Sequence, residues 1–496
     1  MTVRGKAVTP IKKIAFVYLT QASGATYVTD DVAENIQNRP LLGLQYLCAV
    51  CERRGVSTML FDQRIAGFDE AGLLKTAADC DLIGFYCSDP QEDKVKQYGR
   101  WLKAHGAIPI LVGGPSTLEN TSFLDHGCDW VIHGEGERTI GQILDYYEGR
   151  RIREQIKGVS YKKDGEIITA PPQDLIENLD GLPFPDRSKI DIYSYHDYLL
   201  FGMKKPYITL MASRGCPYRC SFCVSYKLWN CRYRQRSVGN VLAEIDDAVA
   251  RYGVKYIGFQ DDVFGGSNAW IEAFCEGLLN RPYRIRWMAI LHPFSIRKDT
   301  DRILGLMKKA GCDALSFGLQ SADSEILKRA GRSPDEPRSL MALVRAADRI
   351  GLVTYVMYIF GLPGETRETI KTTTEYSIRC ASALVTYNVF YSLRGSEIEN
   401  QYQGRPVCDI NQDELVKLSM TASRKFYLSF GTMRRIVYFI AKNPGWLLRA
   451  GFSMASVLAR AGLIRGRKLK AFDSAEQRTV ISKRDQINDE SCAFRC

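Results

Sequence analysis

The chain lacks the features of membrane-spanning, secreted and disordered proteins. No stretch reaches about 18 consecutive uncharged apolar residues, so no membrane span is predicted. The basic residues near the N-terminus are not followed by an apolar segment, so no secretory signal is expected. Tandem repeats and low-complexity tracts are also missing, and 45% hydrophobic with 25% charged residues is typical of a globular protein. We therefore expect about three domains within the 496 residues.

Cysteine, in contrast, is abundant. Fifteen cysteines in a chain without a predicted secretory signal indicate a reducing compartment, where thiols stay free or bind metal. We therefore expect a cytoplasmic protein.

Short apolar runs alternate with helical patterns in the first part of the chain. The runs occupy residues 14–19, 57–62, 81–86, 108–114 and 128–137. Continuous apolar runs between helices indicate a parallel sheet that is covered on both faces. Residues 1–165 are therefore predicted to form a doubly wound, Rossmann-like α/β domain, whose ligand binds where loops leave the carboxyl ends of the strands.

A second alternation follows a proline-containing linker, predicted over residues 166–205. Its strand candidates are residues 207–213, 256–260, 286–291, 314–318, 353–361 and 387–393. Six strand–helix units are too few for an eight-unit barrel, so residues 206–400 are predicted to form a (β/α)6 partial barrel. Active-site loops should again follow the strand ends. Residues 401–496 are predicted to form a helical, basic C-terminal region.

Three cysteines follow the first strand of the second unit: Cys216, Cys220 and Cys223. Four thiolates would saturate a zinc ion or a cubane cluster, whereas three leave one metal position open. An open iron can bind a cofactor and pass an electron to it. The alternatives are a zinc site completed by Cys231, or thiols that cluster without a metal. The position at a strand end favours the iron–sulfur cluster.

This C-x-x-x-C-x-x-C motif, with Phe222 before its last cysteine, resembles the signature of the radical S-adenosylmethionine (SAM) superfamily. The resemblance implies a [4Fe–4S] cluster on the three cysteines. It also implies that SAM chelates the fourth iron, and that reduction yields a 5′-deoxyadenosyl radical. Asp261 and Asp262 end the second strand, where this family places an acceptor for the SAM ammonium group. The alternative for this pair is a helix cap or a solvated turn.

Two later strand ends are similar to the same family. Residues 318–322 resemble its G-[IL]-E-S-G stretch beside the SAM ribose and carboxylate, although Gln320 replaces the usual Glu and offers only a neutral contact. Residues 361–366 match its G-L-P-G-E-T turn near the adenine. The residues expected to bind SAM are Phe222, Asp261, Asp262, Gln320, Ser321, Gly361 and Pro363. No general base is named, because radical abstraction needs none.

The first domain, joined to such a unit, resembles the cobalamin-binding domain of cobalamin-dependent radical SAM enzymes. Residues 40–44 are similar to the opening of the first helix there, and no G-x-G-x-x-G nucleotide fingerprint competes. The glycine-rich turns after two strands let a large flat ligand approach the backbone. The residues expected to contact cobalamin are Gly113, Gly114, Pro115, Gly134, Glu135 and Gly136.

Many cobalamin carriers supply an axial histidine from D-x-H-x-x-G after the first strand. The corresponding loop, residues 20–31, has no histidine. Asp62 begins a similar spacing after the second strand, but Arg64 stands at the place of the histidine. We therefore expect a cobalamin whose lower face has no protein imidazole. His133 is expected to be packed or to support a neighbouring residue, and the alternative is that it is a ligand.

These resemblances predict a cobalamin-dependent radical SAM enzyme that methylates an unactivated carbon of an apolar small molecule. An external electron donor of the flavodoxin or ferredoxin kind is implied. The alternatives are a radical cyclase or rearrangement enzyme with the same cofactors, a radical SAM enzyme that has lost cobalamin, and a cluster-bearing sensor without turnover. Methylthiolation of tRNA is not expected, because neither a second cluster domain nor an RNA-binding barrel is evident.

Acidic residues are missing from residues 415–470, which contain twelve Lys or Arg. The net charge of +11 therefore belongs to this segment, and the rest of the chain is close to neutral. Basic residues among Phe, Tyr and Trp suit an interfacial membrane helix, but a helical cap over the barrel mouth with a solvated basic face is the favoured interpretation. Family members that act on lipids and tetrapyrroles have similar tails, which implies a peripheral membrane contact. Nucleic acid is not expected, because no recognition fold accompanies the charge.

Overall fold

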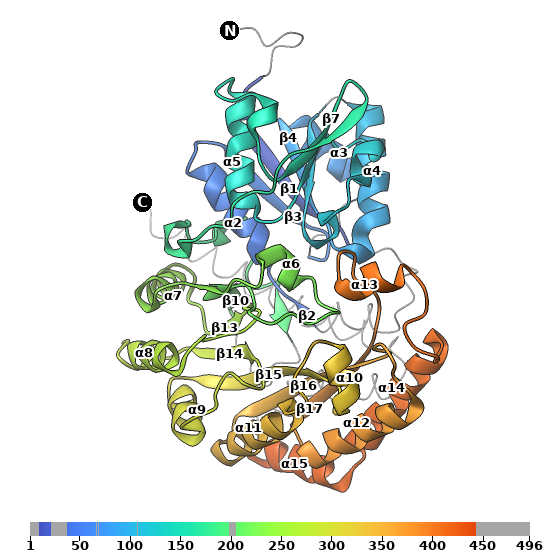
Figure 1. Ribbon diagram of the computed structural model, residues 1–496. Coiled ribbons are helices and arrows are strands. Elements are labelled where there is room, and N and C mark those ends of the chain that lie inside the picture. The colour runs from blue at the N-terminus through green and yellow to red at the C-terminus, as the bar shows by residue number, and fades with distance from the viewer. Residues whose placement is uncertain are drawn as a thin grey trace.

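The computed structural model describes residues 9–20, 37–65, 67, 69–106, 108–197 and 205–442. These residues form an α/β fold with two largely parallel sheets, one of seven strands and one of six. Figure 1 shows the first domain above the second, with helices packed around each sheet. The predicted fold class is thus confirmed.

The first sheet has the strand order β3-β1-β4-β5-β6-β7-β8. Its parallel strands are β1 (Lys13–Tyr18), β3 (Ser57–Asp62), β4 (Leu82–Tyr86), β5 (Ile110–Gly113) and β6 (Trp130–Ile132). Counted along the chain, these strands run 2-1-3-4-5, which is the flavodoxin-like order. The order reverses between β1 and β4, so a ligand is expected beyond their carboxyl ends.

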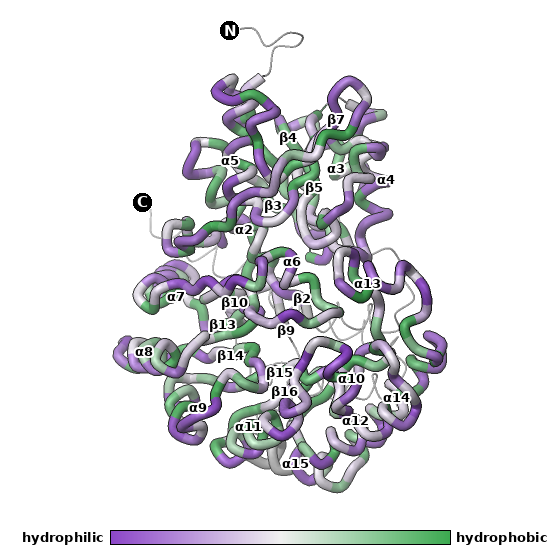
Figure 2. Tube along the Cα trace, viewed as in Figure 1, coloured by the Kyte–Doolittle hydropathy of each residue, from purple (hydrophilic) through white to green (hydrophobic). Residues whose placement is uncertain are grey.

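Both faces of this sheet are buried, as the apolar runs predict. Ile14 and Phe16 of β1 belong to one core cluster, and the alternate residues Ala15 and Val17 belong to another. The covering helices are α2 (Leu42–Glu52), α3 (Glu70–Ala78), α4 (Glu92–His105) and α5 (Gly136–Tyr147). Figure 2 shows the hydrophilic residues of α4 on the outside of the domain.

A hairpin of two antiparallel strands, β7 (Val159–Lys163) and β8 (Glu166–Thr169), extends the sheet beyond β6. The predicted domain boundary at residue 165 falls inside this hairpin, so the connection to the second domain begins after Thr169. All four residues of β8 are exposed. An exposed edge strand has no continuous apolar run, which is why the sequence pattern did not reveal it.

The second sheet is parallel throughout, and its strands follow one another in chain order. They are β10 (Tyr207–Leu210), β13 (Tyr256–Phe259), β14 (Arg286–Leu291), β15 (Cys312–Gln320), β16 (Val353–Phe360) and β17 (Leu384–Val389). The helices after these strands are α7 (Val238–Tyr252), α8 (Asn268–Leu279), α9 (Thr300–Lys309), α11 (Glu336–Ile350), α12 (Arg367–Cys380) and α14 (Gln412–Tyr427). This arrangement confirms the six-unit partial barrel. The last strand begins and ends earlier than predicted, because Leu384 and Val385 pair with β16.

Helix α14 completes the sixth unit, so the predicted boundary at residue 400 divides that unit. Ser419 Oγ donates to Tyr387 O at 2.5 Å, and Tyr427 OH donates to Val385 O at 2.9 Å, both on β17. Helix α15 (Phe430–Lys442) then crosses the amino ends of the strands, where Arg435 contacts Ala381 just before β17. The described part of the basic region therefore does not cap the barrel mouth, so the favoured interpretation of this segment is wrong for these residues.

Shorter elements connect these units. They are β2 (Gln37–Asn38), β9 (His196–Asp197), β11 (Ser213–Arg214), β12 (Arg234–Gln235), α6 (Ser225–Trp229), α10 (Ser324–Arg329) and α13 (Glu397–Tyr402). The 3-10 turns are Asp89–Gln91, Pro115–Thr117, Ser122–His126, Arg153–Gln155, Leu179–Gly181 and Arg187–Lys189. Within the described ranges, every helix is too short or too polar to cross a bilayer.

Candidate active site

The carboxyl ends of the two sheets face each other. Glu135 follows β6 of the first domain and pairs with Arg214, which follows β10 of the second, at 2.7 Å. Glu119 and Lys227 form a further ion pair across the junction, at 2.5 Å. In Figure 1, α6 and α13 lie directly beneath the first domain. Ligand sites of both fold types lie at this end of the strands, so the junction is where the active site is expected.

The cysteine loop leaves β11 through a glycine that no other residue can replace without strain. Gly215 has a φ of +91°, and a Cβ there would lie 2.1 Å from the carbonyl oxygen of Arg232. Further along, Ser221 N donates to Ala330 O at 3.0 Å, which ties the loop to the end of α10. Cys216 and Cys223 are half-buried and Cys220 is buried. The loop therefore holds three thiols at the barrel mouth.

Two protein donors point at the sulfur atoms. Arg332 Nη1 donates to Cys220 Sγ and the backbone N–H of Ser225 to Cys223 Sγ, each at 3.4 Å. Burial raises the pKa of Cys216 to about 12, so a thiolate there needs a metal partner. Three thiols with hydrogen bonds to sulfur fit an iron–sulfur cluster, whose properties depend on such donors.

The zinc alternative is not supported by the arrangement of the side chains. Zinc requires its ligands to converge on one ion at about 2.0 to 2.3 Å. Among the residues that the structure describes, no three His, Cys, Asp or Glu side chains are grouped in this way. Cys231 therefore does not complete a single-ion site with the three loop cysteines, whereas a cubane cluster binds each thiolate at a different iron and does not require this convergence.

The two aspartates after β13 have different environments. Asp261 is only 1% exposed and accepts from Ala212 N at 3.1 Å and from Ser213 Oγ at 2.5 Å, so it braces the strand that leads to the cysteines. Asp262 is exposed and accepts from Ser225 Oγ at 3.1 Å. Desolvation by the surrounding protein nevertheless raises the pKa of Asp262. Asp262, unlike Asp261, is therefore available to a ligand.

Asp261 should make stability depend on pH. Burial raises the pKa of its carboxyl to about 7, against about 3.9 in an unfolded chain. Between these two pKa values the folded state retains a proton that the unfolded state releases. The contribution of Asp261 to the free energy of unfolding therefore falls as the pH rises to 7 and is constant above pH 7.

We expect the difference in unfolding free energy between the native protein and Asp261→Asn to shrink with rising pH in this window. The expected slope is up to about 1.4 kcal/mol per pH unit. Denaturant unfolding at pH 5, 6, 7 and 8 measures it. Asp413→Asn, at an exposed position of α14, serves as the control. A difference that does not change with pH contradicts the assignment.

Gln320 has a backbone conformation that is rare for a residue with a side chain. Its φ is +74°, and the register between β15 and β16 shifts at this point. Gly318 has no Cβ, which leaves room for the side-chain amide of Gln320. The Nε2 atom of that amide lies 2.5 Å from the position that a Cβ of residue 318 would take. Strain of this kind is concentrated at functional sites. Ser321, in contrast, is fully buried, and its hydroxyl lies 3.1 Å from that of Thr373.

The turn after β16 contains a buried carboxyl group with an unused oxygen. Glu365 Oε2 accepts from Gly361 N at 2.5 Å and from Leu362 N at 3.1 Å, whereas its Oε1 has no partner. Burial raises the pKa of Glu365 to about 8. Leu362 packs in a cluster with Phe222 of the cysteine loop. The turn with Gly361 and Pro363 is thus brought beside the cysteine loop, as a SAM site requires.

The predicted cobalamin loops have mixed outcomes. Gly114 has a φ of +120°, and a Cβ there would lie 2.5 Å from Cys87 O. Gly134 has a φ of +78° with open space around it, and Pro115 is exposed beside Gly113. Gly134 and Pro115 leave accessible surface that fits a large flat ligand, whereas the missing Cβ of Gly114 makes room for the backbone of Cys87. Glu135, however, is buried and fully engaged by protein partners.

Among the described strand ends of the first domain, a histidine directly follows β6, and its ring nitrogens are engaged by the protein. His133 is held by Thr117 O at 2.7 Å and by Ser160 Oγ at 2.8 Å, one contact for each ring nitrogen, as expected for a packed histidine. Arg64 pairs with Asp62 at 2.6 Å. Of residues 20–31, only Thr20 lies within the described residues.

Sequence reasoning missed a polar group that backs the cysteine loop. Arg332 also donates to Gly318 O at 2.7 Å and pairs with Glu336 at 2.5 Å, while Tyr218 stacks on His292 with 3.7 Å between ring centroids. Burial and the positive charge of Arg332 lower the pKa of His292 to about 3, so this histidine is neutral. Tyr218 and His292 follow different strands, and Arg332 and Glu336 lie between α10 and the start of α11, so these residues share no motif that a sequence could reveal.

Comparisons with known proteins agree with this geometry. Residues 210–376 match the radical SAM superfamily. The chain is 32% identical over 345 residues to a Pyrococcus horikoshii protein named as an uncharacterized methyltransferase, and the match covers 68% of this chain and 73% of that protein. It is 25% identical over 376 residues to the anaerobic magnesium-protoporphyrin IX monomethyl ester cyclase of Rubrivivax gelatinosus. That match covers 73% of this chain but 64% of the cyclase, less than two thirds.

A solved structure shows the same two-domain fold. It is the radical SAM methyltransferase TsrM from Kitasatospora setae, with cobalamin and a [4Fe–4S] cluster bound. The TM-score is 0.63 at 18% identity, and the match covers 79% of this chain and 76% of that one. Membership of the superfamily implies a [4Fe–4S] cluster and SAM as cofactors. The chain therefore belongs to the radical SAM superfamily, and it shares the fold of the cobalamin-bound methyltransferase TsrM.

Proposed function

We propose that the protein is a cobalamin-dependent methyltransferase that transfers a methyl group to an unactivated carbon of an apolar small molecule. The observation that carries this proposal is the direct apposition of the two strand-end edges, joined by the buried ion pair between Glu135 and Arg214. The names of the relative from Pyrococcus horikoshii and of TsrM support methyl transfer.

The residues present fit the cofactors. Cys216, Cys220 and Cys223 would hold the cluster, and Asp262 and Gln320 would contact SAM. When bound, these groups supply a 5′-deoxyadenosyl radical, and cobalamin supplies the methyl group. The protein itself orients the reactants and excludes water.

Asp261 is assigned to the support of the first strand rather than to SAM, because its oxygens are already used by the backbone. Ser321 is likewise assigned to the packing of α12, and Glu135 to the domain junction. Gly113, Gly114, Pro115, Gly134 and Gly136 remain the residues proposed to lie against cobalamin. The imidazole of His133, directly after β6, has both ring nitrogens engaged by Thr117 O and Ser160 Oγ, so a protein ligand to cobalt is not proposed from the described residues.

Reconstitution tests the proposal. Anaerobic treatment with iron, sulfide and hydroxocobalamin should yield about four irons per chain, with one cobalt and a base-off spectrum. SAM should then be cleaved to 5′-deoxyadenosine under reducing conditions. Four irons without cobalt would contradict the cobalamin-dependent function and leave the radical SAM assignment intact. Cobalt without a cluster would contradict the assignment of the three cysteines.

A radical cyclase is the second candidate, because the relative from Rubrivivax gelatinosus is named as one. The two candidates differ in the mass of the product. Methyl transfer adds one CH2 to the substrate, whereas ring closure adds none. Mass spectrometry with methyl-labelled SAM separates them, because only the methyltransferase incorporates the label.

We further propose a cytoplasmic location and a small flavodoxin- or ferredoxin-like electron donor. The thirteen cysteines within the described residues are all free thiols, as in a reducing compartment. A one-electron donor is required because none of the residues described supplies the electron that reduces the cluster.

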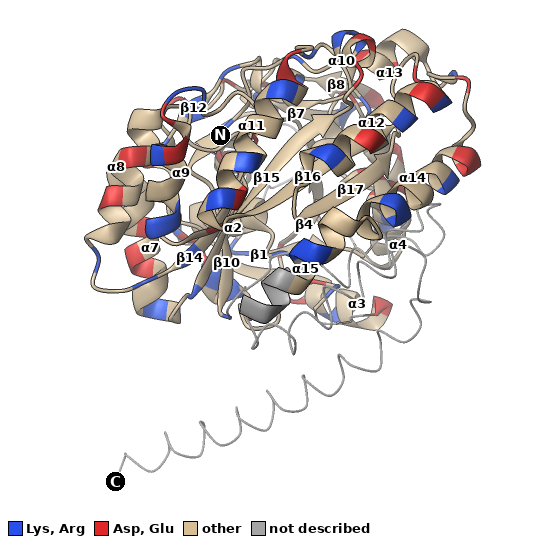
Figure 3. Cartoon of the chain, turned by 90° about the horizontal axis from the view of Figure 1, so that it is seen from below, with Lys and Arg blue, Asp and Glu red and all other residues tan. Residues whose placement is uncertain are grey.

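Helix α15 suits a contact with an anionic membrane surface. Phe430, Met433 and Val437 lie three and four residues apart and are 80%, 46% and 64% exposed. Arg434 is exposed beside them. Figure 3 shows basic residues of α15 on the lower face of the molecule. An apolar helix face with basic neighbours is typical of interfacial binding. This face lies at the amino ends of the barrel strands, opposite the cysteine loop.

Vesicle flotation measures this contact. We expect the protein to float with vesicles that contain anionic lipid at low salt, and to be released at high salt. Replacing Phe430 and Val437 by serine should reduce the bound fraction about tenfold or more, because two exposed apolar anchors are lost. Absence of binding to anionic vesicles at low salt contradicts the proposed membrane contact.

A further inference from the structure

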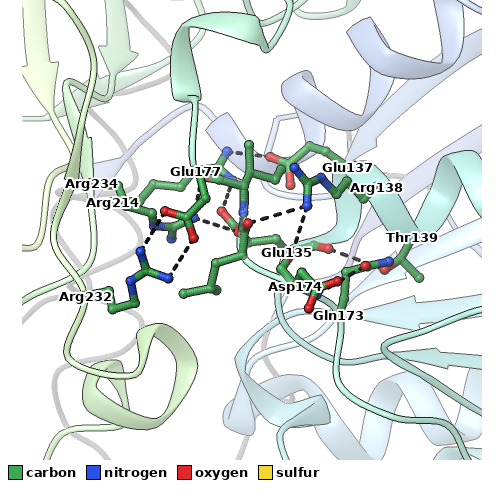
Figure 4. Close-up of polar contacts among 12 residues, drawn as sticks. Glu135, Glu137, Arg138, Thr139, Gln173, Asp174, Glu177, Arg214, Arg232 and Arg234 are labelled. Atoms are coloured by element: carbon green, nitrogen blue, oxygen red, sulfur yellow. Dashed lines mark hydrogen bonds and ion pairs between the residues drawn. The ribbon is translucent and has the colours of Figure 1, made fainter.

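Four charged side chains are buried together at the junction of the two domains. Glu135 and Glu137 come from the start of α5, and Arg214 and Arg234 from the short strands β11 and β12. Their side chains are 2%, 8%, 7% and 5% exposed, in that order. Figure 4 shows the two guanidinium groups directed at the carboxylates across the junction. Two negative and two positive charges balance within the group.

Arg214 binds both carboxylates at once. Its Nη1 donates to Glu135 Oε1 at 2.7 Å and its Nη2 to Glu137 Oε1 at 2.5 Å. The second oxygen of Glu135 accepts from Arg234 Nη1 at 2.8 Å and from Ile176 N at 2.7 Å. The fork of a guanidinium group fixes direction as well as distance. The carboxylate of Glu135, in the first domain, therefore binds both the connecting segment and the second domain.

The position of this group along the chain connects it to both predicted cofactor loops. Arg214 stands two residues before Cys216, and Glu135 stands between Gly134 and Gly136. Burial works against the charged form of Glu135, but Arg214, Arg234 and the N–H of Ile176 together outweigh it and lower the pKa of this carboxyl. A buried ion pair contributes little net stability, since the loss of hydration cancels much of the attraction. Its effect is instead to fix a geometry, because breaking it leaves an uncompensated buried charge.

We propose that Glu135 is a positioning residue that, through Arg214, fixes the separation between the cluster loop and the strand-end loops of the first domain. The inference rests on the proposed function for the identity of the two cofactors, but the mechanical link is a property of the chain alone. A substrate that reacts with groups from both cofactors requires their separation to be held within a fraction of an ångström.

The first test uses the full chain without cofactors. Glu135→Gln keeps the size of the side chain and removes its charge. The matched control is Glu177→Gln, because Glu177 makes a bidentate pair with Arg232 at 2.7 and 2.8 Å next to the same strands but is 56% exposed. Hydrogen–deuterium exchange should accelerate at least about tenfold in residues 131–137 and 213–224 of Glu135→Gln. In Glu177→Gln these rates should stay close to those of the native protein.

The second test uses the protein loaded with cluster and cobalamin. Electron paramagnetic resonance detects the magnetic interaction between cob(II)alamin and the reduced cluster, which depends on their separation. We expect this interaction to be weaker and more broadly distributed in Glu135→Gln, with the iron and cobalt contents unchanged. Glu177→Gln should match the native protein.

The outcomes separate the two proposals. If the native protein binds no cobalamin, the proposed function fails, and hydrogen exchange still decides whether Glu135 links the loops. Exchange rates and magnetic interaction that are the same in Glu135→Gln as in Glu177→Gln would overturn the inference.

Should Glu135→Gln not fold, Arg214→Lys provides the second variant, because lysine keeps the charge but cannot bind both carboxylates with a fork. Native exchange rates in Arg214→Lys would equally overturn the inference.

Discussion

Cys220→Ala will abolish reductive cleavage of SAM, whereas Cys231→Ala will leave it largely intact. Cys220 is the most buried of the three loop cysteines, and its sulfur accepts the hydrogen bond from Arg332. A cluster with two protein ligands is expected to be lost, and the rate of 5′-deoxyadenosine formation should fall by about three orders of magnitude or more. Iron analysis and the spectrum of the reduced cluster provide the independent measurements.

Cys231 is the control that distinguishes a cluster from zinc. It stands in the turn before β12 and is half-buried, so its replacement by alanine should cost little stability. A zinc site built on all four cysteines would lose its metal in either variant. Equal loss of metal from Cys220→Ala and Cys231→Ala would therefore contradict the assignment of the cluster to three cysteines.

Gly114→Ala will remove cobalamin binding while the cluster remains. A Cβ at this position would lie 2.5 Å from Cys87 O and 3.1 Å from Cys87 N, and the φ of +120° is unfavourable for any side chain. With alanine at residue 114, the turn after β5 must therefore move away from the end of β4. The strand order of the sheet reverses beside this end of β4. We expect the cobalt content after reconstitution to fall at least about tenfold, which corresponds to a loss of about 1.4 kcal/mol or more in binding.

The matched control is Gly305→Ala, in the interior of α9. This glycine has no atom within 4 Å of the position of its missing Cβ and no positive φ, so alanine should be tolerated there. Iron content and SAM cleavage should be unchanged in both variants. Full retention of cobalt by Gly114→Ala would contradict the assignment of this turn to cobalamin.

The nature of the site was readable from local signals because its chemistry depends on short spacings. Cys216, Cys220 and Cys223 lie within eight residues, and the Gly361 turn within six, so a single loop fixes each arrangement. The alternation of apolar runs likewise predicted both parallel sheets, since a strand buried on two faces needs apolar residues at every position. The exposed hairpin strand β8 carries no such signal and was missed.

Several roles depended on contacts that no local pattern contains. Asp261 and Asp262 are neighbours of the same residue type, yet only the fold turns the first toward the backbone of Ala212 and leaves the second accessible. Glu135 has the sequence context of a cofactor loop, and the fold commits it to Arg214, seventy-nine residues away along the chain.

The sequence by itself thus determined the two sheets, the position of the cysteine loop at a strand end and the motifs that mark the SAM site. Only the tertiary structure decided which side chains remain accessible, that α14 closes the barrel, and that buried charges join the two domains. The physical reason is that periodicity and short spacing act within one element, whereas burial and the pairing of charge arise when distant elements pack together.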